Sequence, residues 1–258
     1  MWSQLSEFVT NQQRFILATV TETGGSTPRG LGAQIAITEG QLIGTIGGGA
    51  LEKFVIDAAR RLLQKPPNAR VISWLELHLS HDLGMCCGGK VTIMLQDYVP
   101  SPQLFIFGAG HIGQTLAKVA HIAGFKVTVI DDREEWTLQK SFNEGIQVIC
   151  DDLEHHLKGQ KLSPHDYVVV TTYDHGLDQR LIGELTKYEL SYLGLIGSKA
   201  KWLRFTKRLK DISSPDRLSE VRCPMGLNIG AQTPEEIAIS VVAELISTRR
   251  QNSPPSSL

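Results

Sequence analysis

An apolar run followed at once by a glycine-rich turn constrains this chain most strongly. Leu104-Phe105-Ile106-Phe107 suits a strand that is buried on both faces of a parallel sheet, and Gly108-Ala109-Gly110-His111-Ile112-Gly113 follows it directly. A helix should come next, since apolar residues recur at helical spacing at Leu116, Ala117, Val119 and Ala120. Strand, glycine-rich turn and helix in this order predict the first unit of a Rossmann-type domain.

Each of the three glycines answers a separate physical need. Gly108 suits the tight turn, Gly110 lets the backbone approach a pyrophosphate, and Gly113 lets the helix pack closely on the strand. Amides at the helix start then meet the anion. The alternative, a turn whose glycines serve packing only, stays open at this stage, and His111 is most simply a helix-start residue.

An acidic residue favours the nucleotide-binding interpretation. Asp131 ends the next predicted strand, 127–130, where a carboxylate accepts hydrogen bonds from a pair of ribose hydroxyls. Asp132 and Arg133 follow it, and a cation at that place accommodates an extra phosphate. The sequence therefore predicts a phosphate-containing ligand and leaves the choice of nucleotide open.

Apolar runs and helical stretches alternate through the second half of the chain, which is the pattern of a parallel sheet. Strands are predicted at 104–107, 127–130, 146–149, 167–170 and 192–196. The last helix starts at a capping box formed by Thr233 and Glu236, and its apolar stripe is Ile237, Val241, Val242 and Leu245. We predict an α/β fold with a Rossmann-like domain over 103–250 and a disordered, proline-rich tail over 251–258.

The first half predicts a smaller mixed α/β domain over 1–98. Short strands are expected at 15–20, 34–38, 42–46, 71–77 and 90–96, with a tight turn at Glu39-Gly40. A helix is expected at 50–64, with its apolar stripe at Leu51, Phe54, Val55, Ala58, Ala59, Leu62 and Leu63. Pro100 and Pro102 interrupt the hydrogen bonding of helix and strand, so the domain boundary is predicted there.

Composition excludes several classes of protein. With 26 basic and 27 acidic residues the formal charge is −1, which gives no general attraction to nucleic acid or to anionic lipid. No apolar run approaches the roughly 18 residues of a membrane-spanning helix. The start Met1-Trp2-Ser3-Gln4 lacks the features of a signal peptide, and four cysteines are too few for a disulfide framework. A cytoplasmic protein with reduced thiols is expected.

Two glycine-rich loops in the first half each follow a predicted strand. They span 23–30 and 44–52, and both offer dense backbone amides. Arg29 adds a planar donor that suits phosphate or carboxylate, and Gly47, Gly48 and Gly49 stand at the start of the predicted helix, where an anion could be held. Flexible hairpin loops without a ligand remain an equal alternative.

The stretch 83–89 is unusual because Cys86 and Cys87 precede two glycines. A glycine-rich turn that lowers a thiol pKa favours metal or sulfur chemistry. Two neighbouring thiols alone make a poor zinc site, although His78 and His81 lie close in sequence and leave a metal site open as an alternative. The other cysteines, Cys150 and Cys223, are expected to be buried small hydrophobic residues.

Several separated motifs resemble the XdhC/CoxI family of molybdenum-enzyme accessory proteins. They are Gly25-Ser26-Thr27-Pro28-Arg29, Gly44-Thr45-Ile46-Gly47-Gly48-Gly49 with Glu52, Cys87-Gly88-Gly89, Gly194-Leu195-Ile196-Gly197-Ser198-Lys199, Pro224-Met225-Gly226-Leu227-Asn228-Ile229-Gly230 and Thr233-Pro234-Glu235-Glu236-Ile237-Ala238. The resemblance runs from about Phe15 to Glu244. Two positions depart from it: Tyr173 stands where the family commonly carries histidine, and Asn228 stands where aspartate is usual.

The resemblance implies a chaperone that binds the molybdenum cofactor, molybdopterin, assists its sulfuration and delivers it to a xanthine dehydrogenase apoenzyme. A cysteine desulfurase is the implied sulfur source, and a homodimer is the implied assembly. A thiolate near the cofactor would bind molybdenum or shield the labile sulfur, and Cys87 is the expected residue, ahead of Cys86. The cofactor-binding residues expected from motifs and resemblance together are Ser26, Arg29, Gly47, Gly48, Gly49, Glu52, Cys86, Cys87, Gly108, Gly110, Gly113, Asp131, His175, Asp178 and Lys199.

Two other function classes compete with this hypothesis. The first is an NAD(P)-dependent oxidoreductase, which Asp131 favours, with His175, Asp178 and Lys199 as candidate proton donors and acceptors. The second is a nucleotide-sensing or interaction module in which the cysteines are incidental. Fold alone does not decide among them, because function depends on the residues of the site.

Overall fold

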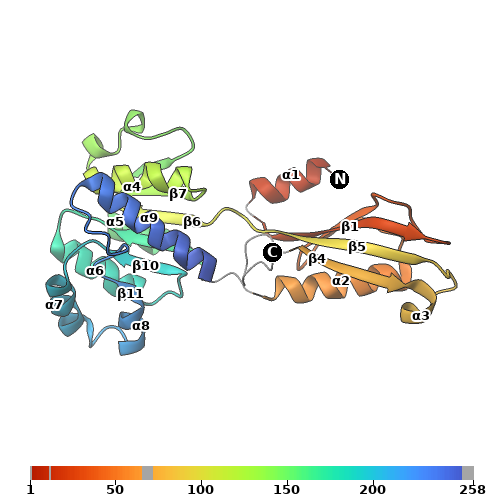
Figure 1. The fold of residues 1–258 in the computed structure, drawn as a ribbon. Coiled ribbons are helices and arrows are strands. Elements are labelled where there is room, and N and C mark those ends of the chain that lie inside the picture. Colours follow the sequence, from red (N-terminus) through yellow and green to blue (C-terminus); the bar gives the residue numbers. More distant parts are fainter. Residues whose placement is uncertain (1, 12, 66–71, 252–258) are drawn as a thin grey trace. The chain divides into compact units, whose positions relative to one another are not determined.

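The structure, a computed structural model, describes residues 2–11, 13–65 and 72–251 and divides them into two compact units, with the division between Pro100 and Ser101 (Figure 1). The α/β class and the Rossmann-like parallel sheet predicted for the second half are confirmed. Val71 and the predicted tail beyond Gln251 lie outside the described residues.

The first unit is an antiparallel sheet with helices on it. Its strands lie in the order β3-β2-β1-β5-β4, and every neighbouring pair is antiparallel. The elements are α1 Trp2–Thr10, β1 Phe15–Gly24, β2 Gln34–Ile37, β3 Leu42–Gly44, α2 Gly49–Leu63, β4 Ile72–His78, α3 Leu79–Leu83 and β5 Lys90–Tyr98. Two short helices, α1 and α3, were not predicted from the sequence.

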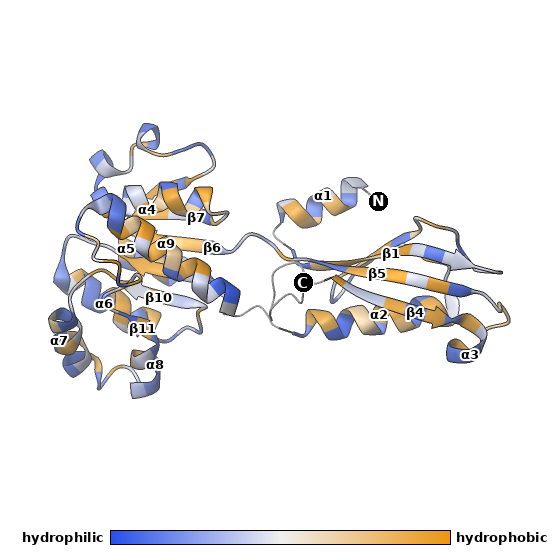
Figure 2. Cartoon of the chain, viewed as in Figure 1, coloured by the Kyte–Doolittle hydropathy of each residue, from blue (hydrophilic) through white to orange (hydrophobic). Residues whose placement is uncertain are grey.

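The predicted stripe of α2 makes the main core of this unit. Leu51, Val55 and Ala59 are buried against the inward side chains of β1, β2 and β5, among them Ile16 and Ile93. In Figure 2, hydrophobic and hydrophilic residues alternate along α2 and β5, as half-buried elements require. The helix α1 packs Leu5 and Phe8 on Phe15 and Leu17 in a second, smaller cluster.

One arginine joins three elements of the first unit. The guanidinium of Arg14, just before β1, donates to both carboxylate oxygens of Asp97 in β5, at 3.1 and 2.6 Å. It also donates to the backbone carbonyls of Leu62, Leu63 and Lys65 at the end of α2. Since the Asp97 side chain is 5% exposed, Arg14 is the cation that pairs with it in the interior.

The second unit is a six-stranded parallel sheet in the order β11-β10-β9-β6-β7-β8. Its strands are β6 Gln103–Phe107, β7 Lys126–Asp131, β8 Gln147–Cys150, β9 Tyr167–Val170, β10 Tyr192–Leu195 and β11 Val221–Arg222. The chain runs outward from β6 to β8 and then returns to the other side of β6 at β9. This is the doubly wound order, and its topological switch point lies between β6 and β9.

Alternate residues of the central strand enter two separate cores. Leu104 and Ile106 pack under α4 His111–Ile122 and α9 Pro234–Gln251, which lie side by side on one face. Phe105 and Phe107 pack on the other face, under α5 Leu153–Gly159, α6 His175–Leu185, α7 Lys199–Leu209 and α8 Pro215–Glu220. The apolar run is therefore buried on both sides, as predicted.

The ends of the helices follow local rules closely. Thr233 Oγ1 accepts from the Glu236 amide, and Glu236 accepts from the Thr233 amide, which confirms the predicted capping box. Asp174, Ser198 and Ser214 cap α6, α7 and α8 through their side-chain oxygens. Two short 3-10 turns, Glu134–Trp136 and Gln139–Ser141, connect β7 to β8.

Replacing Arg14 should destabilise the first unit selectively. Arg14→Met leaves the buried Asp97 carboxylate without its cation, which costs on the order of 3 kcal/mol of unfolding free energy. Hydrogen–deuterium exchange of β1 and β5 peptides measures this, with peptides of β6 and β9 as the internal reference. Arg61→Met on the exposed side of α2 is the matched control, and equal protection in both variants would contradict the assignment.

Candidate functional site

The glycine-rich turn after β6 lies at the switch point, and two of its glycines are required by backbone contacts. A Cβ on Gly108, whose φ is +113°, would lie 2.5 Å from the carbonyl oxygen of Thr171 after β9. A Cβ on Gly113 would overlap the carbonyl oxygen of Gly108. A Cβ on Gly110 would meet no atom within 4 Å. The position where a ligand's phosphate is expected is therefore open.

The carboxylate of Asp131, at the end of β7, is bound within the chain. Its side chain is 2% exposed. One oxygen accepts from the Ala109 amide at 2.6 Å and from Arg133 Nη2 at 2.8 Å, and the other accepts from Arg133 Nε at 2.8 Å and from the Arg133 amide at 3.1 Å. Burial acts to raise the pKa of Asp131, but these donors outweigh it and hold the pKa below its usual value.

Aromatic rings also contact the faces of the Arg133 guanidinium, whose edge is bound to Asp131. Its guanidinium carbon lies 4.4 Å from the ring centroid of Tyr173 and 5.3 Å from that of Trp136. The Tyr173 hydroxyl is 3.5 Å from a carboxylate oxygen of Asp132. We use the name switch-point edge for residues 108–113, 131–133 and 171–175, which follow β6, β7 and β9.

A buried ion pair stands beside this edge. Asp178, in the first turn of α6, is fully buried, and its carboxylate accepts from Lys201 Nζ at 2.5 Å and from Thr172 Oγ1 at 2.7 Å. Lys201 is also buried and donates to the carbonyl of Ile196. His175 Nδ1 is 3.8 Å from the same carboxylate and its side chain is 76% exposed.

Lys199 is the lysine predicted for this region, whereas Lys201 is the lysine that contacts Asp178 in the structure. Lys199 is exposed at the start of α7. The sequence holds one weak signal for this pair. Asp178 falls on the side of α6 that carries the buried Leu181 and Ile182, so a buried cation is expected next to it. No local rule identifies which lysine supplies it.

The two cysteines of the second unit differ from each other. Cys223 is partly buried after β11, its Sγ 4.0 Å from the carbonyl oxygen of Ser198, and burial raises its pKa to about 11. Cys150 is exposed at the end of β8. The prediction that Cys150 is buried is therefore wrong. The strand that carries it, β8, lies at an edge of the sheet, where its Sγ contacts the Asp132 carbonyl oxygen at 4.0 Å and otherwise faces outward.

In the first unit, the loops that carry separate sequence motifs meet. Gly24 pairs with Lys90 where β1 ends and β5 begins, so the loops beyond them are neighbours. A Cβ on Gly89 would overlap the carbonyl oxygen of Ser26. A Cβ on Gly47 would lie 2.5 Å from Pro28 Cβ. These glycines allow a close approach of three loops that no side chain would permit.

Glu52 holds the third of these loops together. Its Oε2 accepts from Thr45 Oγ1 at 2.5 Å, from the Ile46 amide at 3.1 Å and from the Gly48 amide at 3.2 Å. Partial burial acts to raise the pKa of Glu52, but the three donors outweigh it and lower the pKa. Gly47, Gly48 and Gly49 all have positive φ and lead into α2. Glu52 thus positions the loop from within.

The polar and thiol groups around these loops have different exposure. Ser26 and Arg29 are exposed, and the Arg29 side chain has no hydrogen bond or ion pair to any other described residue. Cys86 is exposed, whereas Cys87 is half-buried against the α2 core. No group of three or more metal-ligating side chains occurs among the described residues, so the structure does not support the His78 and His81 alternative.

A scan against protein families decides what kind of chain this is. The model of the XdhC Rossmann domain matches residues 104–245, and that of the XdhC and CoxI family matches residues 8–72. The chain belongs to the XdhC family. The first match covers the doubly wound unit, and the second covers the loops of Ser26, Gly47 and Glu52.

Two curated relatives of this XdhC-family chain are informative. It is 38% identical over 175 residues to a probable xanthine dehydrogenase subunit of Bacillus subtilis strain 168, covering 68% of this chain and 50% of the relative. It is 28% identical over 237 residues to the uncharacterized protein YqeB of Escherichia coli strain K12, covering 91% of this chain and 43% of the relative. The chain therefore spans about half the length of these relatives or less.

A solved structure shares the whole fold. A crystal structure described as a xanthine dehydrogenase of Bacillus halodurans matches with a TM-score of 0.57 over 99% of this chain and 97% of that chain, at 24% identity. At this identity the match shows the fold alone.

None of the helices in the described ranges combines the length and the apolar character needed to cross a bilayer.

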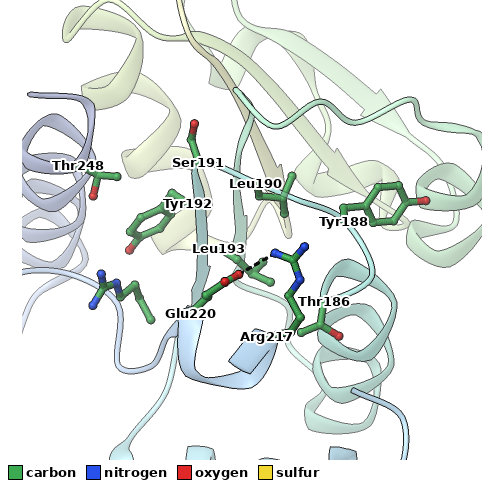
Figure 3. Close-up of a pocket in the computed structure, with 10 residues that line it drawn as sticks. Thr186, Tyr188, Leu190, Ser191, Tyr192, Leu193, Arg217, Glu220 and Thr248 are labelled. Carbon is green, nitrogen blue, oxygen red and sulfur yellow. Dashed lines mark hydrogen bonds and ion pairs between the residues drawn. The ribbon is translucent and has the colours of Figure 1, made fainter. Parts of the chain in front are cut away.

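A small cavity of about 170 Å³ lies at the opposite edge of the second sheet, where β10 and β11 begin. Figure 3 shows Arg217 and Glu220 joined by an ion pair beside it, next to Leu193 and Tyr192. The Tyr192 hydroxyl donates to Glu244, and burial, with this bond, raises its pKa. None of the predicted site residues lines this cavity, so it is not our candidate site.

Removing Lys201 should cost far more stability than removing Lys199. Lys201→Met leaves the Asp178 carboxylate buried without a cation, and we expect a loss of about 3 kcal/mol or more in unfolding free energy. Lys199→Met, two residues away and exposed, should change stability by less than about 0.5 kcal/mol. Urea unfolding of both variants measures the difference, and similar midpoints would show that the pair is not a stabilising contact.

The Thr45–Gly48 turn should loosen in acid. Because the pKa of Glu52 is lowered in the folded chain, its contribution to stability is present above pH 4.5 and is lost as the pH falls through the folded pKa. Glu52→Gln should therefore differ most from the parent chain near pH 6 and least near pH 3.5. Urea unfolding across this range tests it, with the exposed Glu39→Gln as control; a constant difference would refute it.

Proposed function

We propose that this XdhC-family chain is an accessory protein of a xanthine-dehydrogenase-type enzyme and that it binds the molybdenum cofactor, assists its sulfuration and delivers it to the apoenzyme. The name of the Bacillus subtilis relative supports the link to xanthine dehydrogenase. Family membership supports the accessory role. Because this chain spans only half of that relative, the partner and the activity are part of the proposal.

The observation that carries the proposal is the meeting of three loops next to one half-buried thiol. The loops of Ser26, Gly47 and Cys87 are far apart in sequence, yet Gly89 and Gly47 bring their backbones into direct contact. Packing alone does not require three glycine-rich loops to gather at one end of a sheet. A shared ligand gives a physical reason for it.

The groups present fit a phosphate-bearing ligand with a soft metal. The loop at Gly48 and Gly49 has open space where side chains would stand, and it leads into the amino end of α2. Arg29 is exposed beside it, with no ion pair to another described residue. When bound, the cofactor supplies a phosphate for such donors and a molybdenum centre for soft sulfur ligands.

Each residue of the first unit has a definite part in this proposal. The Gly49 amide, with Arg29, binds the phosphate, because the Gly48 amide is already bound to Glu52. Glu52 orients the amide-bearing turn through its three hydrogen bonds and does not touch the ligand. Cys87 offers its thiol toward the metal from a partly buried position that limits access of water. Cys86 lies exposed beside it and has a lesser role.

The remaining members of the assembly are proposed from the same reasoning. A cysteine desulfurase supplies the sulfur, a second copy of the chain completes a homodimer, and the second unit binds a phosphate-containing group at Gly110. The open position at Gly110 supports that last role, since a ligand can approach the backbone there.

Cofactor retention tests the proposal directly. The chain, purified from cells that make molybdopterin, is denatured, and its pterin is measured by fluorescence after oxidation. We expect near-stoichiometric retention by the parent chain and a loss of about tenfold in Cys87→Ser, on the order of one charge-assisted contact. Cys86→Ser should lose less, and Cys150→Ser, which replaces an exposed cysteine of the other unit, is the matched control.

The same measurement can refute the proposal. If the parent chain retains no pterin, the chaperone role fails. If the parent chain retains pterin and Cys87→Ser and Cys150→Ser retain as much, the chain binds the cofactor without Cys87, and the assignment of the thiol fails alone.

A further inference from the structure

The carboxylate that a dinucleotide would need at the switch-point edge has no acceptor position left. An ionised carboxylate offers about four lone-pair positions. Asp131 uses two on each oxygen, for the Ala109 amide, the Arg133 amide, Arg133 Nε and Arg133 Nη2. A ribose diol binds such a carboxylate by donating two hydrogen bonds to it. That interaction requires donors of Arg133 to leave first.

Arg133 is fixed in this position by contacts on several sides. Its edge makes two parallel hydrogen bonds to a carboxylate that is 2% exposed, the geometry in which guanidinium pairs are strongest. Tyr173 and Trp136 place rings within 4.4 and 5.3 Å of its charged carbon. The Arg133 side chain is 25% exposed, so it stands between the carboxylate and solvent.

We propose that Arg133 is the specificity-determining residue of the second unit. It occupies the acceptor positions of Asp131 that a ribose diol would use, so the unit selects against NAD(H). Its ligand is a phosphate-bearing group that is held at Gly110 without a contact between a ribose and the Asp131 carboxylate. This rests on the proposed phosphate-containing group at Gly110, and it goes beyond the chaperone role, on which it does not depend.

A ribose that carries a 2′-phosphate is disfavoured as well. Arg133 would be the receptor for such a phosphate, but its charge is already shared with Asp131 and with the neighbouring Asp132. Two carboxylates and one guanidinium leave a net negative charge, which repels a dianion. Arg133 therefore closes the position to both dinucleotides.

Tyr173 is the positioning residue that keeps the Arg133 guanidinium on Asp131. One side of its ring lies on the guanidinium, and the residue is 62% exposed, so it restrains Arg133 while contributing little to the core. Removing the ring should let Arg133 move away part of the time. Removing only the hydroxyl should leave the guanidinium contact intact, because the bond to Asp132 is long at 3.5 Å.

Titration of the full chain with NADH and NADPH, followed by nicotinamide fluorescence, tests the inference. Arg133→Ala should bind NADH at least about tenfold more tightly than the parent chain, the size of one hydrogen bond to a charged group. Tyr173→Ala should gain less, and Tyr173→Phe should match the parent. Arg217→Ala, which removes an ion-paired arginine at the opposite edge of the same sheet, is the control and should gain nothing.

A gain of binding cannot come from misfolding, which keeps the test decisive. Should Arg133→Ala unfold, Arg133→Gln repeats it with a neutral partner that still donates one hydrogen bond to Asp131. A second readout compares AMP with 2′-deoxy-AMP by calorimetry: the arginine variant should prefer AMP about tenfold, and the parent should not discriminate. Tight binding of NADH or NADPH by the parent chain, or no gain in a folded Arg133 variant, would overturn the inference. Pterin retention by the parent chain is measured separately, so failure here is distinct from failure of the chaperone role.

Discussion

The second unit depends on how closely two backbone segments approach each other at the switch point. Thr171 after β9 donates its hydroxyl to the Gly108 carbonyl at 2.9 Å, and the Gly108 and Gly113 positions have no room for a Cβ. This contact lets the turn between β6 and α4 lie directly beside the segment that leads from β9 into α6. Asp131 bonds to the Ala109 amide beside Gly108, and Asp178 bonds to Thr172 beside Thr171, so both carboxylates are positioned by this contact.

The first unit also depends on a close backbone approach at glycine, here beside an antiparallel sheet. Antiparallel pairing of β1 with β5 sets the ends of two loops side by side, and Gly89 removes the side chain that would hold them apart. Glu52 then fixes the turn at Gly48 through backbone donors. In both units glycine permits contact and a carboxylate orders the amides around it, although the folds are unrelated.

Features that follow from local rules could be predicted from the sequence. The apolar run before Gly108, the stripe of α2 and the capping box of Thr233 each depend on neighbours within a few residues, and all three are confirmed. The short elements α3, α8 and β11 were missed because a few residues carry too little periodicity to be recognised.

The site was predicted less well, because its partners come together only in the folded chain. Asp131 was recognised as the acid at a strand end, but nothing local shows that Arg133 turns back onto it rather than toward a ligand. Likewise Asp178 meets Lys201 and not Lys199, since only one of the two faces the interior. The exposure of Cys150 follows from the strand order, which a single sequence does not reveal.

The strand order of the first unit also bears on how the protein is made. Its last strand along the chain, β5, lies between β1 and β4, so the sheet stays split until Lys90–Tyr98 has been synthesised. Once Tyr98 has left the ribosome, every strand of that sheet is present. The sheet can therefore close while the ribosome is still translating later strands of the second unit, before exposed edges of the two sheets can mispair.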